Sequence, residues 1–109
     1  MDKMEYTKEK VFTFGAIIDY APGAIVSKTI INKTTGTVTL FSFDAGQSLS
    51  EHTAPFDALV QVVEGKALIT INHIDHELKQ GESIIMPAGA PHAVMATEKF
   101  KMILTMIKS

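Results

Sequence analysis

Cysteine is absent from the 109 residues of this chain. A scaffold stapled by disulfides and a metal site built on thiolates are therefore both excluded. A chain without disulfides suits a reducing compartment, so we expect this protein in the cytoplasm.

The chain also lacks a long apolar run and a concentrated basic segment. No stretch approaches the ~18–20 apolar residues that span a bilayer. The first ten residues, MDKMEYTKEK, are too polar for a signal peptide. The net charge is −2 and no cluster of lysines stands out, whereas a nucleic-acid groove needs a concentrated basic face. We therefore expect no membrane partner and no nucleic-acid partner.

Short extended segments, separated by Gly, Pro, Asn and Asp, make up most of the sequence. Val, Ile, Thr and Phe dominate these segments, and sustained helical periodicity is missing. A spacing of roughly 8–12 residues is typical of an all-β sandwich or barrel. The length suits one domain over residues 1–109, with an N-terminal arm or strand over residues 1–24. The predicted strands are 25–32, 37–44, 58–63, 66–72, 77–79, 83–86, 93–97 and 101–107, with a hairpin turn at 72–75.

Several predicted strands are apolar on both of their faces. Val60 and Val62 alternate with Leu59 and Val63, and residues 102–107 follow the same pattern. A strand with one wet face would alternate cleanly between apolar and polar residues, so the second face needs a cover. A partner subunit would supply that cover, which predicts a homodimer. The alternative is that residues 11–20 (VFTFGAIIDY) fold back over the sheet.

Two glycine-bounded segments stand out as candidate carriers of chemistry. Residues 46–65 read GQSLSEHTAPFDALVQVVEG, and residues 81–96 read GESIIMPAGAPHAVMA. These segments resemble the two signature motifs of the cupin family, G(X)5HXH(X)3,4E(X)6G and G(X)5PXG(X)2H(X)3N. The resemblance implies a jelly-roll β-barrel, or double-stranded β-helix, with a pocket at one mouth.

The resemblance also implies a metal motif that is incomplete. Cupins bind a divalent metal through two histidines and a glutamate of the first motif and a histidine of the second. Here only His52 and His92 match, because Ala54 and Ala58 replace the other histidine and the glutamate, and Ala96 replaces the final asparagine. A catalytic metal site normally uses at least three protein ligands. We expect either one weakly held divalent ion (Zn, Fe, Mn or Ni) on His52 and His92, or no cofactor.

Three other titratable side chains lie near these positions or at metal-like spacing. Asp57 is the best substitute for the missing carboxylate, although strand alternation points it away from the Ala58 face unless a bulge re-aims it. Its alternative role is to brace the turn at residues 54–56 through backbone N–H groups. His73 and His76 belong to the predicted hairpin, where we expect exposed turn residues.

Strand alternation from the motif positions predicts which side chains line the pocket. Alanines at two ligand positions make that pocket apolar with very few polar groups, which is the general composition of a small-molecule site. Phe41, Phe43, Met102 and Met106 could extend the lining. The predicted ligand-binding residues are His52, His92, Ala54, Phe56, Ala58, Val60, Met86 and Val94.

Three functional hypotheses follow. The first is a cupin that binds a small organic ligand through His52 and His92. The second is a divalent-metal-dependent cupin enzyme of the dioxygenase, isomerase or cyclase type, with a weak two-histidine site. The third is a structural or interaction module whose pocket is vestigial. The sequence names no substrate and no reaction.

Overall fold

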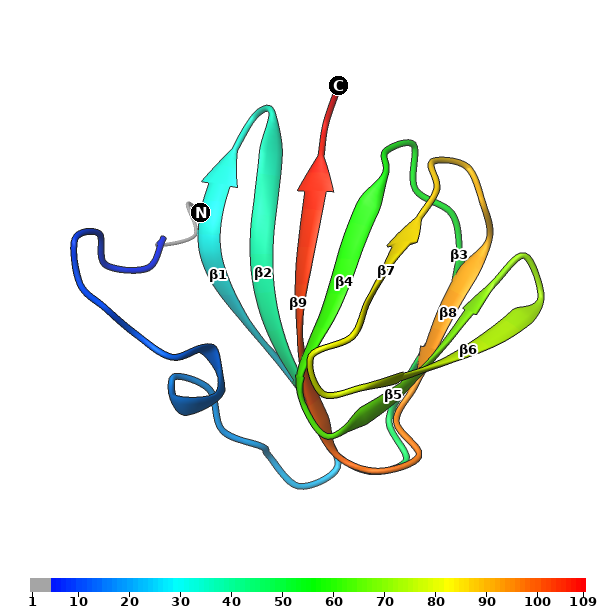
Figure 1. Cartoon of the computed structure of the whole chain (residues 1–109), viewed down its shortest axis with the longest axis horizontal. Helices are drawn as coiled ribbons and strands as arrows, with labels where there is room; N and C mark the ends of the chain where they lie inside the picture. The colour runs from blue at the N-terminus through cyan, green and yellow to red at the C-terminus, as the bar shows by residue number, and fades with distance from the viewer. Residues whose placement is uncertain (1–4) are drawn as a thin grey trace.

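The computed structural model describes residues 5–109, which fold into antiparallel β-strands (Figure 1). Within that range the one helical element is a single 3-10 turn, η1 (Phe14–Ala16). No helix of the described residues is long and apolar enough to cross a membrane. The strands are β1 (Ile25–Lys33), β2 (Gly36–Phe43), β3 (Ser48–His52), β4 (Ala58–Glu64), β5 (Lys66–Ile71), β6 (Ile74–Lys79), β7 (Ser83–Met86), β8 (His92–Met95) and β9 (Phe100–Ile107).

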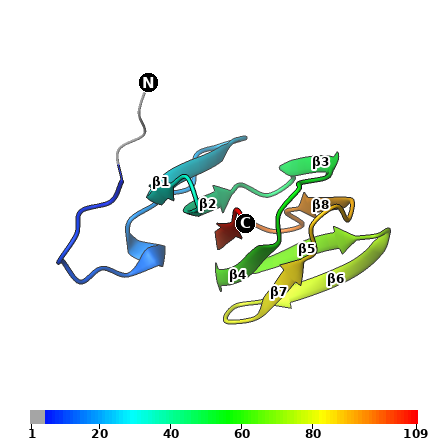
Figure 2. The same ribbon diagram turned by 90° about the horizontal axis from the view of Figure 1, so that it is seen from above.

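The strands form two sheets that enclose the core. One sheet has five strands in the order β1-β2-β9-β4-β7, and the other has four in the order β3-β8-β5-β6. Every pairing within them is antiparallel. Figure 2 shows the two sheets from above, with residues 5–24 outside the five-stranded sheet and away from the four-stranded one. The predicted all-β jelly-roll architecture is confirmed.

Alternation along the central strands builds the core. In β4, Val60 and Val62 are fully buried, while Leu59 and Gln61, which alternate with them, face outward. In β5, which belongs to the four-stranded sheet, Ile69 is fully buried and faces the same core. Phe43 and Phe100 stack between the sheets with ring centroids 4.6 Å apart. Each buried aliphatic or aromatic side chain contributes about 1.5–3 kcal/mol of hydrophobic stabilisation, so this alternation stabilises the barrel.

The structure corrects the sequence prediction at two strands. β3 was not predicted, because only Leu49 of its five residues is apolar. β6 begins at Ile74 rather than at residue 77, because the turn before it is only two residues long. Asn72 and His73 both have positive φ, 50° and 66°, as the primed turns of tight hairpins require.

Residues 6–18 of the N-terminal arm cover part of the outer face of the five-stranded sheet. Ile18 is buried there with Leu40 and Ile103, and four further side chains of the arm pack against the same cluster: Tyr6, Phe12, Phe14 and Ile17. The alternative in which residues 11–20 fold back is therefore the arrangement observed. The arm removes part of the reason for expecting a homodimer, which stays a prediction.

A polar cluster fixes the arm to β4 and β9. The Lys101 amine is buried, donates to the Gly15 carbonyl at 2.7 Å and lies 3.6 Å from Glu64 Oε2. The Tyr20 hydroxyl donates to the same Glu64 oxygen at 2.5 Å. Burial of the phenol, followed by its hydrogen bond to Glu64, raises the pKa of Tyr20 well above its ordinary value. Three separate segments thus meet at one carboxylate.

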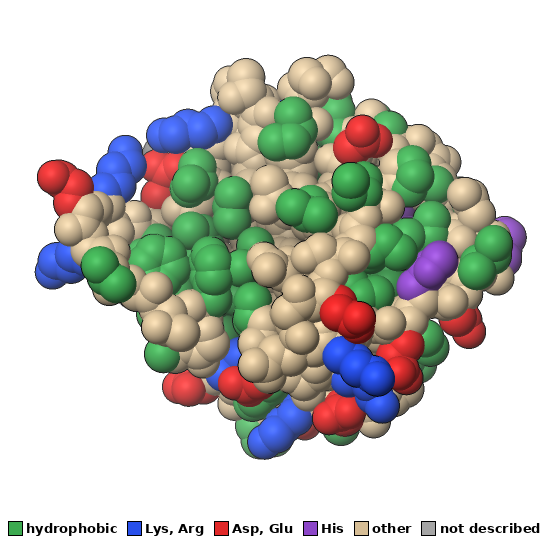
Figure 3. Space-filling view, viewed as in Figure 1, with side chains coloured by type: hydrophobic (Ala, Val, Ile, Leu, Met, Phe, Trp, Pro, Cys, Tyr) green, Lys and Arg blue, Asp and Glu red, His purple; other side chains and the backbone are tan. Residues whose placement is uncertain are grey.

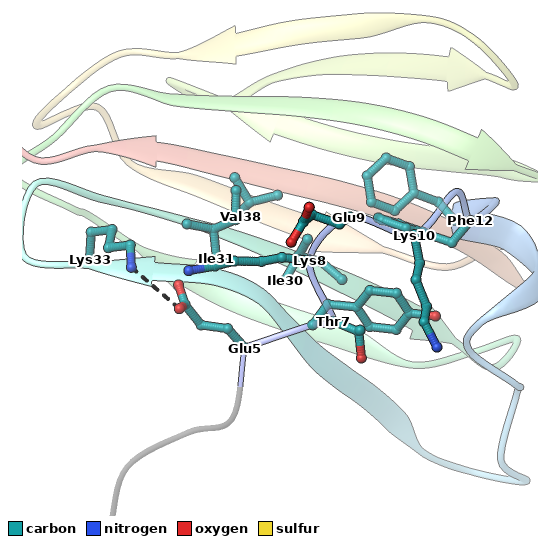
Figure 4. A pocket seen from close by; sticks show the side chains of 12 residues that line it. Glu5, Thr7, Lys8, Glu9, Lys10, Phe12, Ile30, Ile31, Lys33 and Val38 are labelled. Carbon is teal, nitrogen blue, oxygen red and sulfur yellow. Dashed lines mark hydrogen bonds and ion pairs between the residues drawn. The ribbon is translucent and has the colours of Figure 1, made fainter.

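A cavity lies between the arm and the β1–β2 hairpin (Figure 4). Its volume is about 480 Å³, with Ile30, Ile31 and Val38 on the sheet side. Charged residues of the arm surround it, and Glu5 pairs with Lys33 at 3.3 Å. Glu5 also accepts from the Asn32 backbone N–H at 2.7 Å. These contacts tie Glu5 of the arm to the end of β1.

Candidate functional site

Two histidines meet at one mouth of the barrel. His52 ends β3 and His92 begins β8, and the two residues are paired in the backbone register of those strands. Their ring centroids lie 4.3 Å apart with the ring planes at 68°. His92 is 5% exposed, while His52 is exposed to solvent. The two motif histidines that the sequence singled out therefore form an edge-to-face pair, with one ring inside the barrel and one at its entrance.

Backbone contacts fix the tautomer of both rings. His52 Nδ1 lies 2.8 Å from the Ser50 carbonyl oxygen, and His92 Nδ1 lies 3.1 Å from the Ala90 carbonyl oxygen. A carbonyl oxygen can only accept a hydrogen bond, so each Nδ1 carries the proton and donates it. In a neutral ring this leaves Nε2 unprotonated, as a hydrogen-bond acceptor or a metal ligand. The pair therefore presents two nitrogen lone pairs.

The histidines border a small, mostly apolar cavity with walls from both sheets. Its volume is about 60 Å³, room for roughly two water molecules at ~30 Å³ each. Pockets that enclose drug-sized ligands are several times larger, at about 300–1,000 Å³. The lining consists of Phe41, Leu49, His52, Ala54, Ala58, Met86, His92, Val94, Met102, Leu104 and Met106.

Six of the eight residues predicted to bind ligand line this cavity, and two lie elsewhere. Phe56 is half-buried outside the barrel mouth, beside Pro55 and Ala88. Val60 is fully buried in the core two residues beyond Ala58.

Two lining residues escaped the sequence prediction. Leu49 was missed because β3 was missed. Leu104 was missed although it lies between Met102 and Met106 on the same face of β9, and that two-residue spacing was the signal that could have found it.

Asp57 is engaged away from the cavity. Its Oδ1 accepts a hydrogen bond from the Ala88 backbone N–H at 2.8 Å. The Gly89 N–H donates to the Ala54 carbonyl at 2.8 Å, beside that contact. Asp57 therefore braces the loop between β7 and β8. The sequence analysis had instead suggested that Asp57 braces the turn that precedes it, at residues 54–56. The two contacts join the loops that frame the mouth.

The other two histidines stay outside the cavity lining. His73 lies in the β5–β6 turn, with Nδ1 3.2 Å from Glu51 Oε1. His76 is half-buried within β6, so the prediction of an exposed turn residue holds for His73 and is wrong for His76. The Glu51 contact also places the turn nearer to His52 than the sequence spacing indicated.

The donor set does not fit a conventional divalent centre. Among residues 5–109, no group of three or more His, Cys, Asp and Glu side chains is arranged to hold a metal ion. Ala54 and Ala58 line the cavity where the cupin motif has a histidine and a glutamate. Two imidazoles bring no negative charge to offset a divalent cation, so they would hold it weakly.

The two facing sheets and the histidine pair at the mouth define a protein of the double-stranded β-helix class. The family is then specified by a cupin domain model that matches residues 39–108. This chain belongs to the cupin family, with an incomplete metal motif. No curated protein matches the sequence.

Several solved structures resemble the chain. A conserved protein of unknown function from Streptococcus pyogenes is 33% identical with a TM-score of 0.92, over 100% of this chain and 96% of that one. A cupin 2 conserved barrel domain protein from Leptotrichia buccalis is 41% identical with a TM-score of 0.86, over 89% of this chain and 47% of that one. A cupin superfamily protein from Desulfitobacterium hafniense has a TM-score of 0.90 over 100% of both chains, and at 23% identity it supports the fold alone.

Proposed function

We propose that this cupin binds a small organic molecule at the barrel mouth, with His52 and His92 holding its polar end. The observation that carries the proposal is the edge-to-face ring pair at 4.3 Å, with both Nδ1 atoms committed to backbone carbonyls. A structural histidine needs only one satisfied nitrogen, whereas two adjacent rings that both donate from Nδ1 to the backbone leave both Nε2 atoms for a ligand.

The chemistry of the cavity limits the ligand. Because neutral Nε2 atoms accept hydrogen bonds, the ligand has to bring a donor such as a hydroxyl, an amine or a protonated acid. A cavity of about 60 Å³ admits only a few non-hydrogen atoms. The remainder of the molecule would extend past the exposed His52, where the Ala54 and Ala88 loops frame the opening.

The second candidate is a divalent-metal-dependent enzyme of the dioxygenase, isomerase or cyclase type. The two available Nε2 atoms favour it, and the alanines at the other ligand positions oppose it. In such an enzyme His52 and His92 would hold Zn, Fe, Mn or Ni, and the ion would polarise a bound substrate or water.

We also propose that the protein is cytoplasmic and forms a homodimer. The absence of cysteine supports the location, and the apolar side chains that the arm leaves exposed support the homodimer.

A fragment screen by NMR tests the binding proposal. Protein prepared without an affinity tag is titrated with small alcohols, amines and carboxylic acids while the imidazole ¹⁵N signals are followed. We expect saturable shifts at Nε2 of His52 and His92, lost in His92→Ala. His73→Ala is the matched control, because its ring lies outside the cavity lining and should leave the shifts intact.

The same preparation separates the alternatives. Elemental analysis that finds one equivalent of Zn, Fe, Mn or Ni, lost in both His52→Ala and His92→Ala, would support the enzyme. Absence of any saturable shift across the screen, together with absence of metal, would contradict both and leave the interaction module.

A further inference from the structure

Three methionines line the cavity that contains the histidine pair. Met86 comes from β7, and Met102 and Met106 come from β9. Met86 and Met102 are buried, at 4% and 2% exposure, and Met106 is half-buried. In the side chains that line the cavity, the only atoms besides carbon and hydrogen are therefore the imidazole nitrogens and the three thioether sulfurs.

The backbone register places two of these methionines around the vacated carboxylate position. Ala58, which stands where the cupin motif has its glutamate, is paired with Met86 across β4 and β7. It is also paired with Met106 across β4 and β9. Both methionines therefore flank the point at which a carboxylate would have approached the metal. With alanine at residue 58, the neutral, soft thioether sulfurs of Met86 and Met106 surround a position that lacks the hard, anionic carboxylate of the cupin motif.

Imidazole and thioether together select a different kind of metal ion from the divalent ions of the full motif. Soft sulfur ligands favour Cu(I), whereas carboxylate and water favour hard divalent cations. A monovalent ion also brings half the charge into a mostly apolar cavity, where an uncompensated charge is expensive. Neutral ligands therefore suit Cu(I) better than they suit Zn, Fe, Mn or Ni.

We propose that the cavity is a soft-metal site that binds one Cu(I) ion through Nε2 of His52, Nε2 of His92 and the thioether sulfur of Met86 or Met106. The site uses the same two histidines as the proposed function but requires no organic ligand, so it goes beyond that function. Binding displaces no proton from either neutral ring, because the proton sits on Nδ1. The exposed His52 edge gives the ion its entry, and the buried His92 and Met86 restrict water at the inner end.

Methionine is also a common filler of irregular cores, and the test has to separate filling from ligation. Leucine serves this purpose, because the exchange of Met for Leu nearly conserves volume and usually costs less than about 1.5 kcal/mol. A methionine that only fills space can be replaced by leucine without affecting metal binding. A methionine that donates its sulfur cannot.

The experiment is a metal titration of the full-length, tag-free protein. Ag(I) serves as a redox-inert probe, and Cu(I) is supplied without oxygen in competition with bicinchoninate. The readouts are the ¹³C-methyl signals of the methionines and the imidazole ¹⁵N signals. We expect one equivalent of Ag(I) or Cu(I) to shift the methyl of Met86 or Met106 together with Nε2 of both histidines. Zn(II) at the same concentration should shift no methionine methyl.

Variants identify the ligands. The double variant Met86→Leu/Met106→Leu, and separately His92→Ala, should weaken Cu(I) binding by at least about tenfold. Met95→Leu is the matched control, because Met95 is 40% exposed on β8 and does not line the cavity. Its affinity should equal that of the unmodified protein, as should that of His73→Ala.

Two results would overturn the proposal. One is unchanged Cu(I) affinity in a folded Met86→Leu/Met106→Leu protein, and the other is Ag(I) shifts confined to surface methionines. The fragment shifts at the histidines should survive the double leucine variant, so failure of the metal site and failure of the organic-ligand site give different patterns.

Discussion

Tyr20 is the side chain whose ionisation the fold perturbs most clearly. Its phenol is partly desolvated and donates to Glu64, which stabilises the neutral form in the folded state and raises the pKa of Tyr20. A group that holds its proton more tightly when folded contributes stability below its unfolded pKa and loses it as the pH rises further. For a tyrosine that loss begins near pH ~10.

We therefore predict that Tyr20→Phe flattens the alkaline limb of the stability profile. The free energy of unfolding, measured by urea denaturation between neutral pH and about pH 11, should fall more steeply for the unmodified protein than for the variant above about pH 10. Tyr6→Phe provides the matched control, since Tyr6 packs on the arm without the Glu64 contact. Parallel profiles for the unmodified protein and Tyr20→Phe would show that the Glu64 contact does not hold the phenolic proton.

Sequence reasoning found the two histidines but not their orientation. The resemblance of the two glycine-bounded segments to the cupin motifs implied that His52 and His92 lie at one mouth of the barrel. The tautomer depends on the carbonyls of Ser50 and Ala90, and sequence spacing carries no information about which carbonyl a ring will meet. The same limit applies to Asp57, whose partner Ala88 lies in a different loop.

The glycines of the two motifs mark the turns that separate the strands. Gly46, Gly65, Gly81 and Gly89 all have positive φ, at 87°, 77°, 88° and 78°. At Gly65 a side chain would also meet the backbone of Lys99 and Phe100, where β4 turns into β5 beside the start of β9. At Gly46 nothing lies within 4 Å of the position of an added Cβ.

These two positions give a matched pair of alanine substitutions. Gly46→Ala should lower the free energy of unfolding by about 1 kcal/mol, which is the left-handed backbone strain alone. Gly65→Ala should lower it by about 2–4 kcal/mol, because steric overlap with Lys99 and Phe100 adds to that strain. Chemical denaturation measures both values. Equal losses would mean that the neighbouring backbone moves aside freely.

Strand prediction succeeded where both the pattern and the turns were strong. The ends of β7 were predicted to the residue, and those of β4 to within one residue. β3 was lost because an edge strand with one half-buried residue, Leu49, has almost no hydrophobic signal. The predicted β5–β6 turn, residues 72–75, was too long, because the sequence does not show that Asn72 and His73 both adopt positive φ.

The face of the molecule that carries the arm keeps an apolar patch beside it. Leu59 and Ile85 are paired between β4 and β7 and are 41% and 61% exposed. Ile107 on β9 is 56% exposed. Figure 3 shows hydrophobic side chains gathered over this face, among them those of the arm. The arm was recognised in the sequence only as an alternative cover, because the pairing of residues 11–20 with a particular sheet face is a long-range contact.

We predict that this patch joins two copies of the chain. Sedimentation at micromolar concentration should give a dimer, and Leu59→Glu/Ile85→Glu should give a monomer, since burial of each side chain is worth about 1.5–3 kcal/mol. Ile74→Glu is the matched control, because Ile74 is 62% exposed on β6 of the other sheet. A stable monomer of the unmodified protein at that concentration would contradict the predicted dimer.

The position of β9 has a consequence for how the chain folds as it is synthesised. β9 lies between β2 and β4 in the five-stranded sheet, although it follows them by dozens of residues. It also carries Lys101 and Ile103, to which the arm attaches. β2 can pair with β1 and the arm can contact Ile30 before β9 is made, but neither β2 nor the arm can complete its contacts until residues 100–107 have left the ribosome. Such non-local pairings are slow to form. The contacts between the arm and β9 therefore form late, although the arm precedes β9 in the chain, and part of the apolar surface of the arm stays exposed to solvent until then.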